Sequence, residues 1–509
     1  MNAQDQAAVI AFLADPATHG VESVERIDTH AAIVFLAGDR AFKLKRAVRF
    51  SYLDYSTLAA RERSCRAELT LNRRTAPELY EEVQPIIRDG DGGLSFGGAG
   101  TVADWVVVMR RFDQDTLFDR MAESGRLTLP LMLALAEQIA RFHADAEIDW
   151  TAGGAQGLAA SVASDARNLR AAAPEIFEAA AVDSLIAATR AELARNAELL
   201  EARRRAGEVR HCHGDLHLRN ICLVEGRPTL FDCIEFNPAI SNIDVLYDLA
   251  FLLMDLDARR LQALGNAVFN RYLDGRDEGD GLPALPLFLS VRAGVRAHVT
   301  AAAARQQPDD GARRRLVEQA RAYLSQAVDL LQPRPPCLIA VGGLSGSGKS
   351  SVAYGLAPAL GQVPGARVLR SDVLRKNLFG VASTQRLSPS AYGEDVTARV
   401  YRRMREEAAA VLAAGRCVIA DALHARPAER EAIADVARAA GVPFVGLWLE
   451  APAAVLTGRV AARRGDASDA TVDVLKRQLA YDLGPMSWTR VDAGGALEAV
   501  IAAARRVAA

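Results

Sequence analysis

The 509-residue sequence predicts two successive domains of different construction, a mixed α+β domain with two lobes and then an α/β domain built on a parallel sheet. Two observations lead to this prediction. Short apolar runs separated by turn residues come first and give way to a long helical stretch, whereas strand-like and helix-like segments alternate from residue 337 onward. A proline-rich stretch, QPRPP, separates the two patterns. We therefore place the domains at 1–332 and 337–509, with a linker at 333–336.

The composition describes a globular chain with few special features. Half of the residues are hydrophobic and 24% are charged, so ample apolar surface can be buried. A net charge of −2 disfavours a nucleic-acid partner, although it does not exclude a local basic patch on the surface. The six cysteines form no C-x-x-C pair and are expected to be reduced thiols. With neither a signal peptide nor a membrane span expected, we predict a cytoplasmic protein and leave its oligomeric state open.

The N-terminal lobe, about 1–112, begins with short strands. The strand expected at 40–44 carries Lys43, and with Lys45 this side chain lies on the face opposite Phe42, because side chains alternate along a strand. One of the two lysines is placed to touch nucleotide phosphates, and Glu68 could pair with it. The alternative is that all three are solvated surface charges.

The rest of the first domain is expected to be mainly helical. Residues 89–100 are glycine-rich and predict a turn, which a strand at 105–109 and a polar segment follow. A kinase with two lobes would place its hinge there. The C-terminal lobe, about 113–332, shows apolar spacings of three and four that are typical of helices.

A motif for phosphoryl transfer lies within this lobe. Residues 211–220 read HCHGDLHLRN, and after a hairpin-like stretch the sequence continues as TLFDCIEF. An aspartate, an asparagine shortly after it and a second aspartate beyond a hairpin form the catalytic apparatus of the protein-kinase class of folds. Asp215 would accept the proton of an acceptor hydroxyl, while Asn220 and Asp232 would hold Mg²⁺ through hard oxygen ligands.

The rival interpretation of this segment is a zinc site. His211, His213 and His217 are closely spaced, and imidazole suits zinc. That interpretation leaves Asp215 and Asn220 without a role, so we prefer the kinase-type site and expect His213 to be structural.

The second domain opens with a complete phosphate-binding loop. GLSGSGKS at 343–350 matches G-x-x-x-x-G-K-[ST] and directly follows an apolar strand. Backbone N–H groups of such a loop point at phosphate oxygens, Lys349 would reach the β- and γ-phosphates, and the Ser350 hydroxyl would hold Mg²⁺. The residues expected to bind the nucleotide are Gly343, Ser345, Gly346, Ser347, Gly348, Lys349, Ser350 and Ser351.

Polar residues at the ends of the following strands complete this second site. Asp372 and Asp421 come at the carboxyl ends of two expected strands, where ligands of parallel sheets bind. One carboxylate can activate an acceptor hydroxyl and the other can support Mg²⁺. Arg459, Arg463 and Arg464 could neutralise charge on the transferring group. The strands are expected at 337–341, 367–369, 417–420, 444–449 and 489–491.

Both halves resemble known enzymes. The first, from about Val21 to Leu256, resembles the aminoglycoside phosphotransferase and choline kinase superfamily through HGDLHLRN, LFDCIEF and NIDVLYDLA, in which Asp248 would brace the catalytic loop. The second is similar to small P-loop kinases of the gluconate kinase, zeta-toxin and polynucleotide 5′-kinase type through GLSGSGKS, SDVLR, VIADA and RVAARRGDASDA. Their order resembles a bacterial family described as bifunctional aminoglycoside phosphotransferase-like and ATP-binding proteins.

The resemblance implies a protein-kinase-like domain followed by a P-loop kinase domain, and it assigns residues. Asp215 and Asp372 become the catalytic bases, Lys349 and Arg463 catalytic cations, Arg375 a substrate contact and Asp421 a metal ligand. The first lobe has no G-x-G-x-x-G loop, so the sequence does not identify the element that covers the phosphates. No acidic pocket for a polycationic drug is identified, so antibiotic resistance is not predicted.

We therefore expect two sites that use ATP and Mg²⁺ and move the γ-phosphoryl group to a hydroxyl of a small metabolite, such as a sugar, sugar acid, amino alcohol or nucleoside. One alternative is a regulatory switch in which one domain binds ATP without transfer. Another is 5′-hydroxyl phosphorylation of a polynucleotide, which Asp372 and Arg375 suggest.

Overall fold

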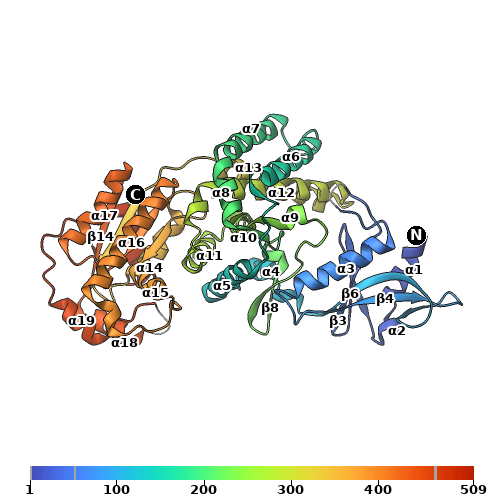
Figure 1. Cartoon of the computed structure of the whole chain (residues 1–509), viewed down its shortest axis with the longest axis horizontal. Helices are drawn as coiled ribbons and strands as arrows, with labels where there is room; N and C mark the ends of the chain where they lie inside the picture. Colours follow the sequence, from blue (N-terminus) through green and yellow to red (C-terminus); the bar gives the residue numbers. More distant parts are fainter. Residues whose placement is uncertain (1–2, 51–52, 464–466, 509) are drawn as a thin grey trace. The chain divides into compact units, whose positions relative to one another are not determined.

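The computed structural model describes residues 3–50, 53–463 and 467–508, and the chain divides into two compact units. The first unit comprises the residues up to 167 together with 193–255. The second comprises 168–192 and everything from 256 onward. Figure 1 labels the elements of both units.

The first unit opens with an antiparallel sheet of order β1-β2-β3-β6-β4-β5. Helix α1 (Ala3–Ala14) packs on one face of this sheet against Phe35, and α3 (Leu58–Asn72) packs on the other against Leu36. Neighbouring strand residues point to opposite faces, so the buried pattern of β2 serves both helices. The strands are β1 (Val24–Asp28), β2 (Ala32–Ala37), β3 (Arg40–Lys45), β4 (Tyr80–Arg88), β5 (Leu94–Phe96) and β6 (Thr101–Arg110).

The rest of the first unit is helical, with two small antiparallel ribbons. Strand β7 pairs with β10, and β8 pairs with β9 to form the hairpin that the sequence predicts after HGDLHLRN. The apolar segment that carries Asp248 is α10, and most of its side chains are buried. The elements are α2 (Pro16–His19), α4 (Phe118–Glu123), α5 (Leu129–Asp145), α8 (Ala197–Ala206), β7 (Val209–His211), β8 (Ile221–Val224), β9 (Arg227–Leu230), α9 (Pro238–Ser241), β10 (Asn242–Asp244) and α10 (Val245–Ala258).

The second unit contains a parallel sheet of order β12-β13-β11-β14-β15. Helices α14 and α20 cover one face of it around Ile339, and α16 and α17 pack beside β13 and β14. The strands are β11 (Leu338–Gly343), β12 (Arg367–Arg370), β13 (Val418–Asp421), β14 (Phe444–Glu450) and β15 (Thr489–Asp492). The helices are α14 (Lys349–Leu356), α15 (Ser371–Leu378), α16 (Glu394–Ala413), α17 (Pro427–Ala440), α18 (Ala453–Ala462), α19 (Val472–Leu479) and α20 (Leu497–Ala508).

Helices that precede the phosphate-binding loop belong to this second unit as well. They are α11 (Gln262–Gly275), α12 (Leu285–Gln306) and α13 (Asp310–Leu330), of which the last two pack along each other. Helices α6 (Gly154–Ala172) and α7 (Ala179–Arg195) complete the chain.

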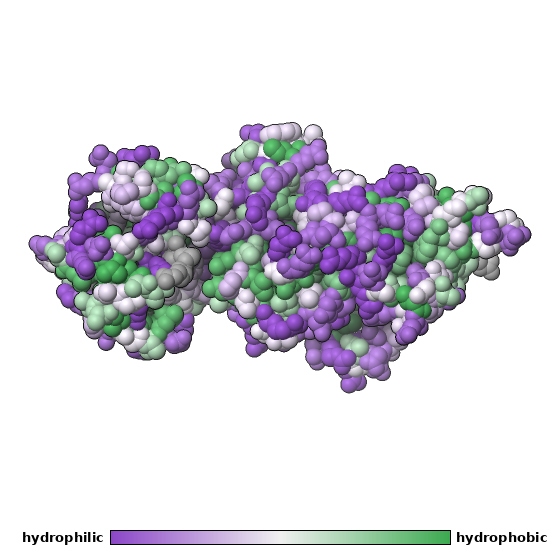
Figure 2. All heavy atoms as spheres, turned by 90° about the horizontal axis from the view of Figure 1, so that it is seen from below, coloured by the Kyte–Doolittle hydropathy of each residue, from purple (hydrophilic) through white to green (hydrophobic). Residues whose placement is uncertain are grey.

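The sequence predictions and the structure agree best in the second domain, where all five predicted strands are present within a few residues of their expected bounds. The glycine-rich stretch 89–100, predicted as a turn, contains strand β5. All six cysteines are free thiols, as expected, and five of them are buried. Within the described ranges, every helix is too short or too polar to span a bilayer. Hydrophilic residues are spread over the face in Figure 2, with hydrophobic ones in smaller areas between them.

Candidate active sites

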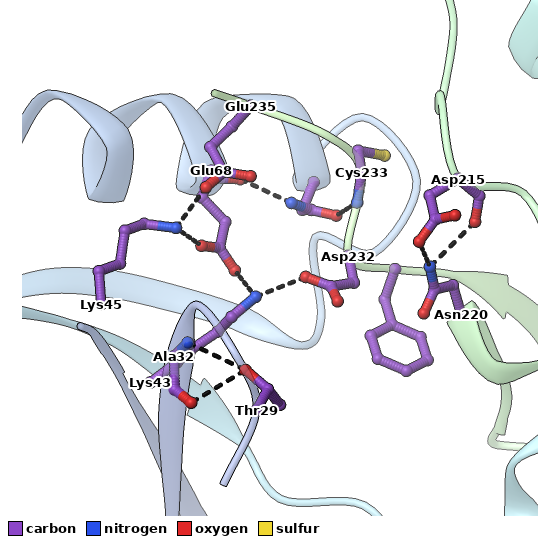
Figure 3. Close-up of polar contacts among 12 residues, drawn as sticks. Thr29, Ala32, Lys43, Lys45, Glu68, Asp215, Asn220, Asp232, Cys233 and Glu235 are labelled. Atoms are coloured by element: carbon purple, nitrogen blue, oxygen red, sulfur yellow. Dashed lines mark hydrogen bonds and ion pairs between the residues drawn. The ribbon is translucent and has the colours of Figure 1, made fainter. Parts of the chain in front are cut away.

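The lysines of β3 meet a single carboxylate of α3 in the first site (Figure 3). Lys43 Nζ lies 2.7 Å from Glu68 Oε1 and 2.5 Å from Asp232 Oδ1. Lys45 Nζ lies 2.5 Å from Glu68 Oε2 and also pairs with Glu235. The Lys43 side chain is 15% exposed and that of Lys45 only 2%. Burial alone would raise the pKa of Glu68, but the two ammonium groups outweigh it and lower the pKa to about 2.

Asp232 is held in a backbone conformation that few residues adopt. Its φ of 62° lies in the left-handed region, which aspartate tolerates better than most side chains. The Asp232 N–H donates to the Tyr80 hydroxyl at 3.2 Å, and the next N–H, of Cys233, donates to Asn72 Oδ1 at 2.8 Å. Asn72 Nδ2 in turn donates to the Glu68 carbonyl at 2.9 Å. The segment that carries Asp232 is therefore tied to α3.

Glu235 is a residue of this site that sequence reasoning missed. Its carboxylate is buried, pairs with Lys45 and accepts a hydrogen bond from the Tyr55 hydroxyl at 2.5 Å. The only sequence signal is an acidic residue three positions after Asp232 in an otherwise apolar run. Glu235 is therefore a second anionic partner of Lys45, and both side chains of the pair are buried.

Asp215 and Asn220 lie side by side in the loop after β7 (Figure 3). Asn220 Nδ2 donates to both the carbonyl oxygen and Oδ2 of Asp215, each at 2.9 Å. Since the amide nitrogen is committed to Asp215, the oxygen is the atom that Asn220 can offer to a cation. Figure 3 shows Lys43, Glu68 and Asp232 in the same region as Asp215 and Asn220.

Asp248 braces the loop that carries Asp215. Its carboxylate accepts the N–H of His213 at 3.1 Å and the N–H of Gly214 at 2.9 Å, and it also bonds to His143 at 3.1 Å. This is the bracing contact that the resemblance implied. Two backbone donors and a ring nitrogen on one buried carboxylate leave the loop little freedom.

The histidines of the loop are engaged in separate contacts. His213 Nε2 bonds to the Phe231 carbonyl at 2.9 Å, whereas His217 Nε2 lies 3.3 Å from Asp215 Oδ1. In the part of the chain that the structure describes, one group of three or more His, Cys, Asp or Glu side chains is close enough to share a metal ion. It consists of His143, Cys212 and Asp248, a different set from the three loop histidines. The zinc interpretation is therefore not supported.

The turn between β1 and β2 lies beside Lys43 (Figure 3) and is closed by a threonine. Thr29 Oγ1 donates to the Ala32 carbonyl and accepts the Ala32 N–H, both at 2.9 Å. The next residue, His30, is close enough to the catalytic loop for its pKa to respond. Burial lowers that pKa, and the charges of Asp215 and Asp232 oppose the effect. A turn without glycine therefore lies next to the residues expected to bind phosphate.

The phosphate-binding loop of the second site joins β11 to α14. Gly343 has a φ of 141°, and a Cβ there would lie 2.6 Å from the Leu449 carbonyl oxygen, so only glycine fits. Lys349 Nζ donates to the Leu344 carbonyl at 3.1 Å, and Ser345 N donates to Gln478 Oε1 at 2.9 Å. Gln478 belongs to α19, and its contact with the phosphate-binding loop was not predicted. In the sequence, Gln478 is only one position of a helical pattern, and nothing there indicates a contact with Ser345.

The side chains around this loop offer hard oxygen ligands. The Ser350 hydroxyl donates to Asp421 Oδ2 at 2.5 Å, and Arg370 Nε lies 3.5 Å from the same oxygen. The Ser347 hydroxyl is buried, and no hydrogen-bond partner is present among the described residues. A hydroxyl and a carboxylate in contact, beside an unsatisfied loop hydroxyl, fit Mg²⁺ and a phosphate group.

The second carboxylate, Asp372, lies in the first turn of α15. Burial raises its pKa and the charge of Asp421 adds to this, while Arg370 acts in the opposite direction. Burial lowers the pKa of Lys349, and the positive charges of Arg463 and Arg370 lower it further. The negative charges of Asp421 and Asp372 act in the opposite direction. The charges of Asp421, Asp372 and Arg463 therefore all act on Lys349.

Two of the remaining predicted residues, Arg375 and Arg459, donate to backbone carbonyls. Arg375 is buried over the Tyr392 ring, and its guanidinium donates to the Ala391 carbonyl at 2.7 Å. Arg459 donates to the Ala493 carbonyl at 2.8 Å, which is a structural contact. Arg464 lies outside the described residues. Near α15, Asp469 accepts from Lys376 at 3.1 Å and from the Tyr392 hydroxyl at 2.6 Å, and sequence reasoning did not single it out.

Two protein families match separate parts of this chain. Residues 59–282 match the family described as the phosphotransferase enzyme family, and residues 338–482 match a family described as an AAA domain. Uncharacterized proteins of Mycobacterium tuberculosis and Mycobacterium bovis are 31% identical to it over 485 residues, which cover 92% of this chain and 92% of each relative.

Solved structures resemble one part or the other. A sugar kinase from Janibacter covers 34% of this chain and 95% of its own at 24% identity, with a TM-score of 0.26. A gluconokinase from Sinorhizobium meliloti covers 35% of this chain and 96% of its own at 22% identity and a TM-score of 0.25. A choline/ethanolamine kinase family protein from Mesorhizobium loti covers 65% of this chain and 95% of its own at 16% identity and a TM-score of 0.38.

Proposed function

Since the chain belongs to the family that joins a phosphotransferase domain to a P-loop kinase domain, which it shares with its mycobacterial relatives, we propose that it is a bifunctional phosphotransferase. Each domain transfers the γ-phosphoryl group of ATP to a hydroxyl of a small metabolite. The acceptor class is a sugar, sugar acid, amino alcohol or nucleoside.

In the first site, Lys43 binds the phosphates and Lys45 serves as a buried anchor. A group that binds phosphate must reach the open side of the site, and Lys43 does so between Glu68 and Asp232. Lys45 is closed off between Glu68 and Glu235. Asp215 takes the proton of the acceptor hydroxyl, and the hydrogen bond from Asn220 keeps its carboxylate oriented for that task.

In the second site, Lys349 and the loop N–H groups bind the phosphates, and Asp372 takes the proton. A raised pKa makes Asp372 a better proton acceptor than an ordinary aspartate, as a general base requires. Arg463 lies near Lys349 and offsets negative charge on the transferring group. Arg375 contacts the acceptor.

Metal ligands are assigned in the same way. Asn220 and Asp232 hold Mg²⁺ in the first site, and Ser350 and Asp421 hold it in the second. When bound, the ion neutralises phosphate charge as the bond to the leaving oxygen breaks. The contact of 2.5 Å between Ser350 and Asp421 supports this pairing.

One observation carries the proposal: each site combines a lysine near carboxylates, a set of hard oxygen ligands and a separate carboxylate that can accept a proton. The test uses γ-labelled ATP, Mg²⁺ and a bacterial metabolite extract with the wild type, Asp215→Ala and Lys349→Ala. Each variant is expected to lose one set of labelled small molecules and to keep the other.

Three results would contradict the proposal. Label that reaches only water would favour the regulatory switch, in which ATP is bound without transfer. Label on polynucleotide 5′ ends would favour the nucleic-acid alternative. Loss of every product in both variants, with both still folded, would mean that the two sites do not act separately.

A further inference from the structure

Strand β12 is an edge strand of the parallel sheet, because it stands first in the strand order and, among the strands that the structure describes, pairs with β13 alone. An edge strand leaves a row of backbone N–H and C=O groups without a strand partner. Helix α11, which belongs to the same compact unit, lies against this edge. It also belongs to the stretch that matches the phosphotransferase family.

The side chain of Asn270 pairs with the open edge as a neighbouring strand would. Its Oδ1 accepts the Val368 N–H at 2.7 Å, and its Nδ2 donates to the Ala366 carbonyl at 3.2 Å. A strand offers the same combination of one acceptor and one donor to an edge. Asn270 is 0% exposed, so water does not compete for these groups.

Two further residues of α11 extend the contact. Asn266 Nδ2 donates to the carbonyls of Pro364 and Ala366, each at 3.0 Å. Asp274 Oδ1 accepts a hydrogen bond from Arg367 Nη1 at 2.7 Å. The three side chains are spaced by four residues, which puts them on one face of the helix. We call Asn266, Asn270 and Asp274 the edge clamp.

The strand that the edge clamp holds leads directly to the catalytic carboxylate. Strand β12 ends at Arg370, and Asp372 stands in the first turn of α15. Arg370 itself lies 3.5 Å from Asp421. The clamp also touches α15, because Asn377 Nδ2 donates to the Asp274 carbonyl at 3.3 Å. Both flanks of Asp372 are thus bonded to α11.

We propose that Asn270 and Asp274 are positioning residues of the second phosphoryl-transfer site, through which a helix of the phosphotransferase-family stretch fixes the place of Asp372. The inference rests on the function proposed for that site. Asp372 must stay within hydrogen-bond reach of the acceptor hydroxyl, and a displacement of about 1 Å can cost about 100-fold in rate. The phosphate-binding loop follows β11, an inner strand, and the hydrogen bonds of the clamp named above do not reach it.

The test replaces Asn270 with Leu, which has a similar size and no hydrogen-bonding groups in its side chain, and Asp274 with Asn, which keeps the size, removes the charge and exchanges one acceptor oxygen for an amide group. Gln262→Ala, at an exposed position on the same helix, is the matched control. We measure the Lys349-dependent labelling of metabolites from γ-labelled ATP, the KM for ATP, the Asp215-dependent labelling and amide hydrogen exchange over 366–370.

We expect Asn270→Leu to lower kcat of the Lys349-dependent transfer by at least 10-fold and Asp274→Asn by a smaller factor. Exchange over 366–370 should rise in both, the KM for ATP should stay within twofold, and Asp274→Glu should restore part of the rate. Unchanged kcat with faster exchange would overturn the proposal, as would equal losses in both reactions for Asp274→Asn.

Failure of this inference can be told apart from failure of the proposed function. If the wild type shows no Lys349-dependent transfer, the function proposed for the second site fails. In that case exchange over 366–370 still reports on the clamp. Exchange that Asn270→Leu leaves unchanged would then overturn the clamp by itself.

Discussion

Lys43 Nζ lies 2.5 Å from Asp232 Oδ1, so a cation of the β-rich lobe touches the predicted metal-binding carboxylate directly. Lys45, two residues further along the same strand, instead faces Glu235. Neighbouring lysines of one strand face are thus divided between an accessible contact and a buried one.

Substitution of these two lysines by methionine should have different effects. Lys43→Met should lower the Asp215-dependent kcat about 100- to 1,000-fold, because a preorganised cation at the phosphates is removed. It should cost less stability than Lys45→Met, because Glu68 keeps Lys45 as a partner. Lys45→Met should cost about 3–5 kcal/mol of unfolding free energy, because Glu235 is left buried without its cation. Initial rates and urea unfolding of both variants would show the two effects, and the opposite pattern would reverse our assignment.

Glu68 makes the stability of the first domain sensitive to acid. Its pKa is about 2 in the folded protein and 4.5 ordinarily, so its contribution is complete above pH 4.5 and is lost as the pH falls toward 2. Glu68→Gln should therefore be less stable than the wild type at pH 6, and the gap should narrow between pH 4.5 and 3. Urea unfolding at pH 6, 4 and 3 measures this gap. If the difference in unfolding free energy between the two proteins stays constant over this pH range, the two lysines do not lower the pKa of Glu68.

Asp372 should determine the acidic limb of the second reaction. Because its pKa is raised above the ordinary 3.8, the Lys349-dependent rate should begin to fall at a higher pH than an ordinary aspartate would allow. The charge of Arg370 lowers this pKa, so Arg370→Gln should move the limb to still higher pH. Profiles of kcat against pH for the two proteins test the shift, and a limb that moves downward would exclude Asp372 as the base.

Ser350 should control the Mg²⁺ requirement of the second site alone. Ser350→Ala removes a hydroxyl that contacts Asp421, so half-maximal Lys349-dependent transfer should need several-fold more Mg²⁺. The Asp215-dependent reaction of the same protein is the internal control. Equal Mg²⁺ curves for wild type and variant would remove Ser350 from the metal site.

The sequence was sufficient where chemistry is local. The phosphate-binding loop, the strand before it and the catalytic loop with Asp215 and Asn220 are contiguous motifs whose conformation depends on nearby residues. The five parallel strands were found because buried strands are apolar runs bounded by turn residues. Strand β5 was missed because a three-residue strand within a glycine-rich stretch has no measurable period.

The features that the sequence did not predict depend on contacts between residues far apart in the chain. Alternation along β3 places Lys43 and Lys45 on one face, but their division depends on Glu235, which is 190 residues away from Lys45 in the chain. Asn270 is a poor helix former in a helical pattern. Nothing nearby in the sequence indicates that its side chain bonds to the edge strand at Val368, which lies 98 residues further along the chain. Such contacts have no periodicity, so no single-sequence pattern reveals them.

The edge clamp has a consequence for gene dissection. A fragment that starts at Cys337 carries every motif of the P-loop kinase, yet it lacks α11 and would leave the N–H and C=O groups of β12 bare. Bare strands of this kind recruit one another, so the fragment is expected to self-associate through β12. A fragment that also contains α11 keeps this cover over β12 and should not self-associate through that edge. We therefore expect the proline-rich stretch to be a poor place to divide this chain, because a cut there separates α11 from β12.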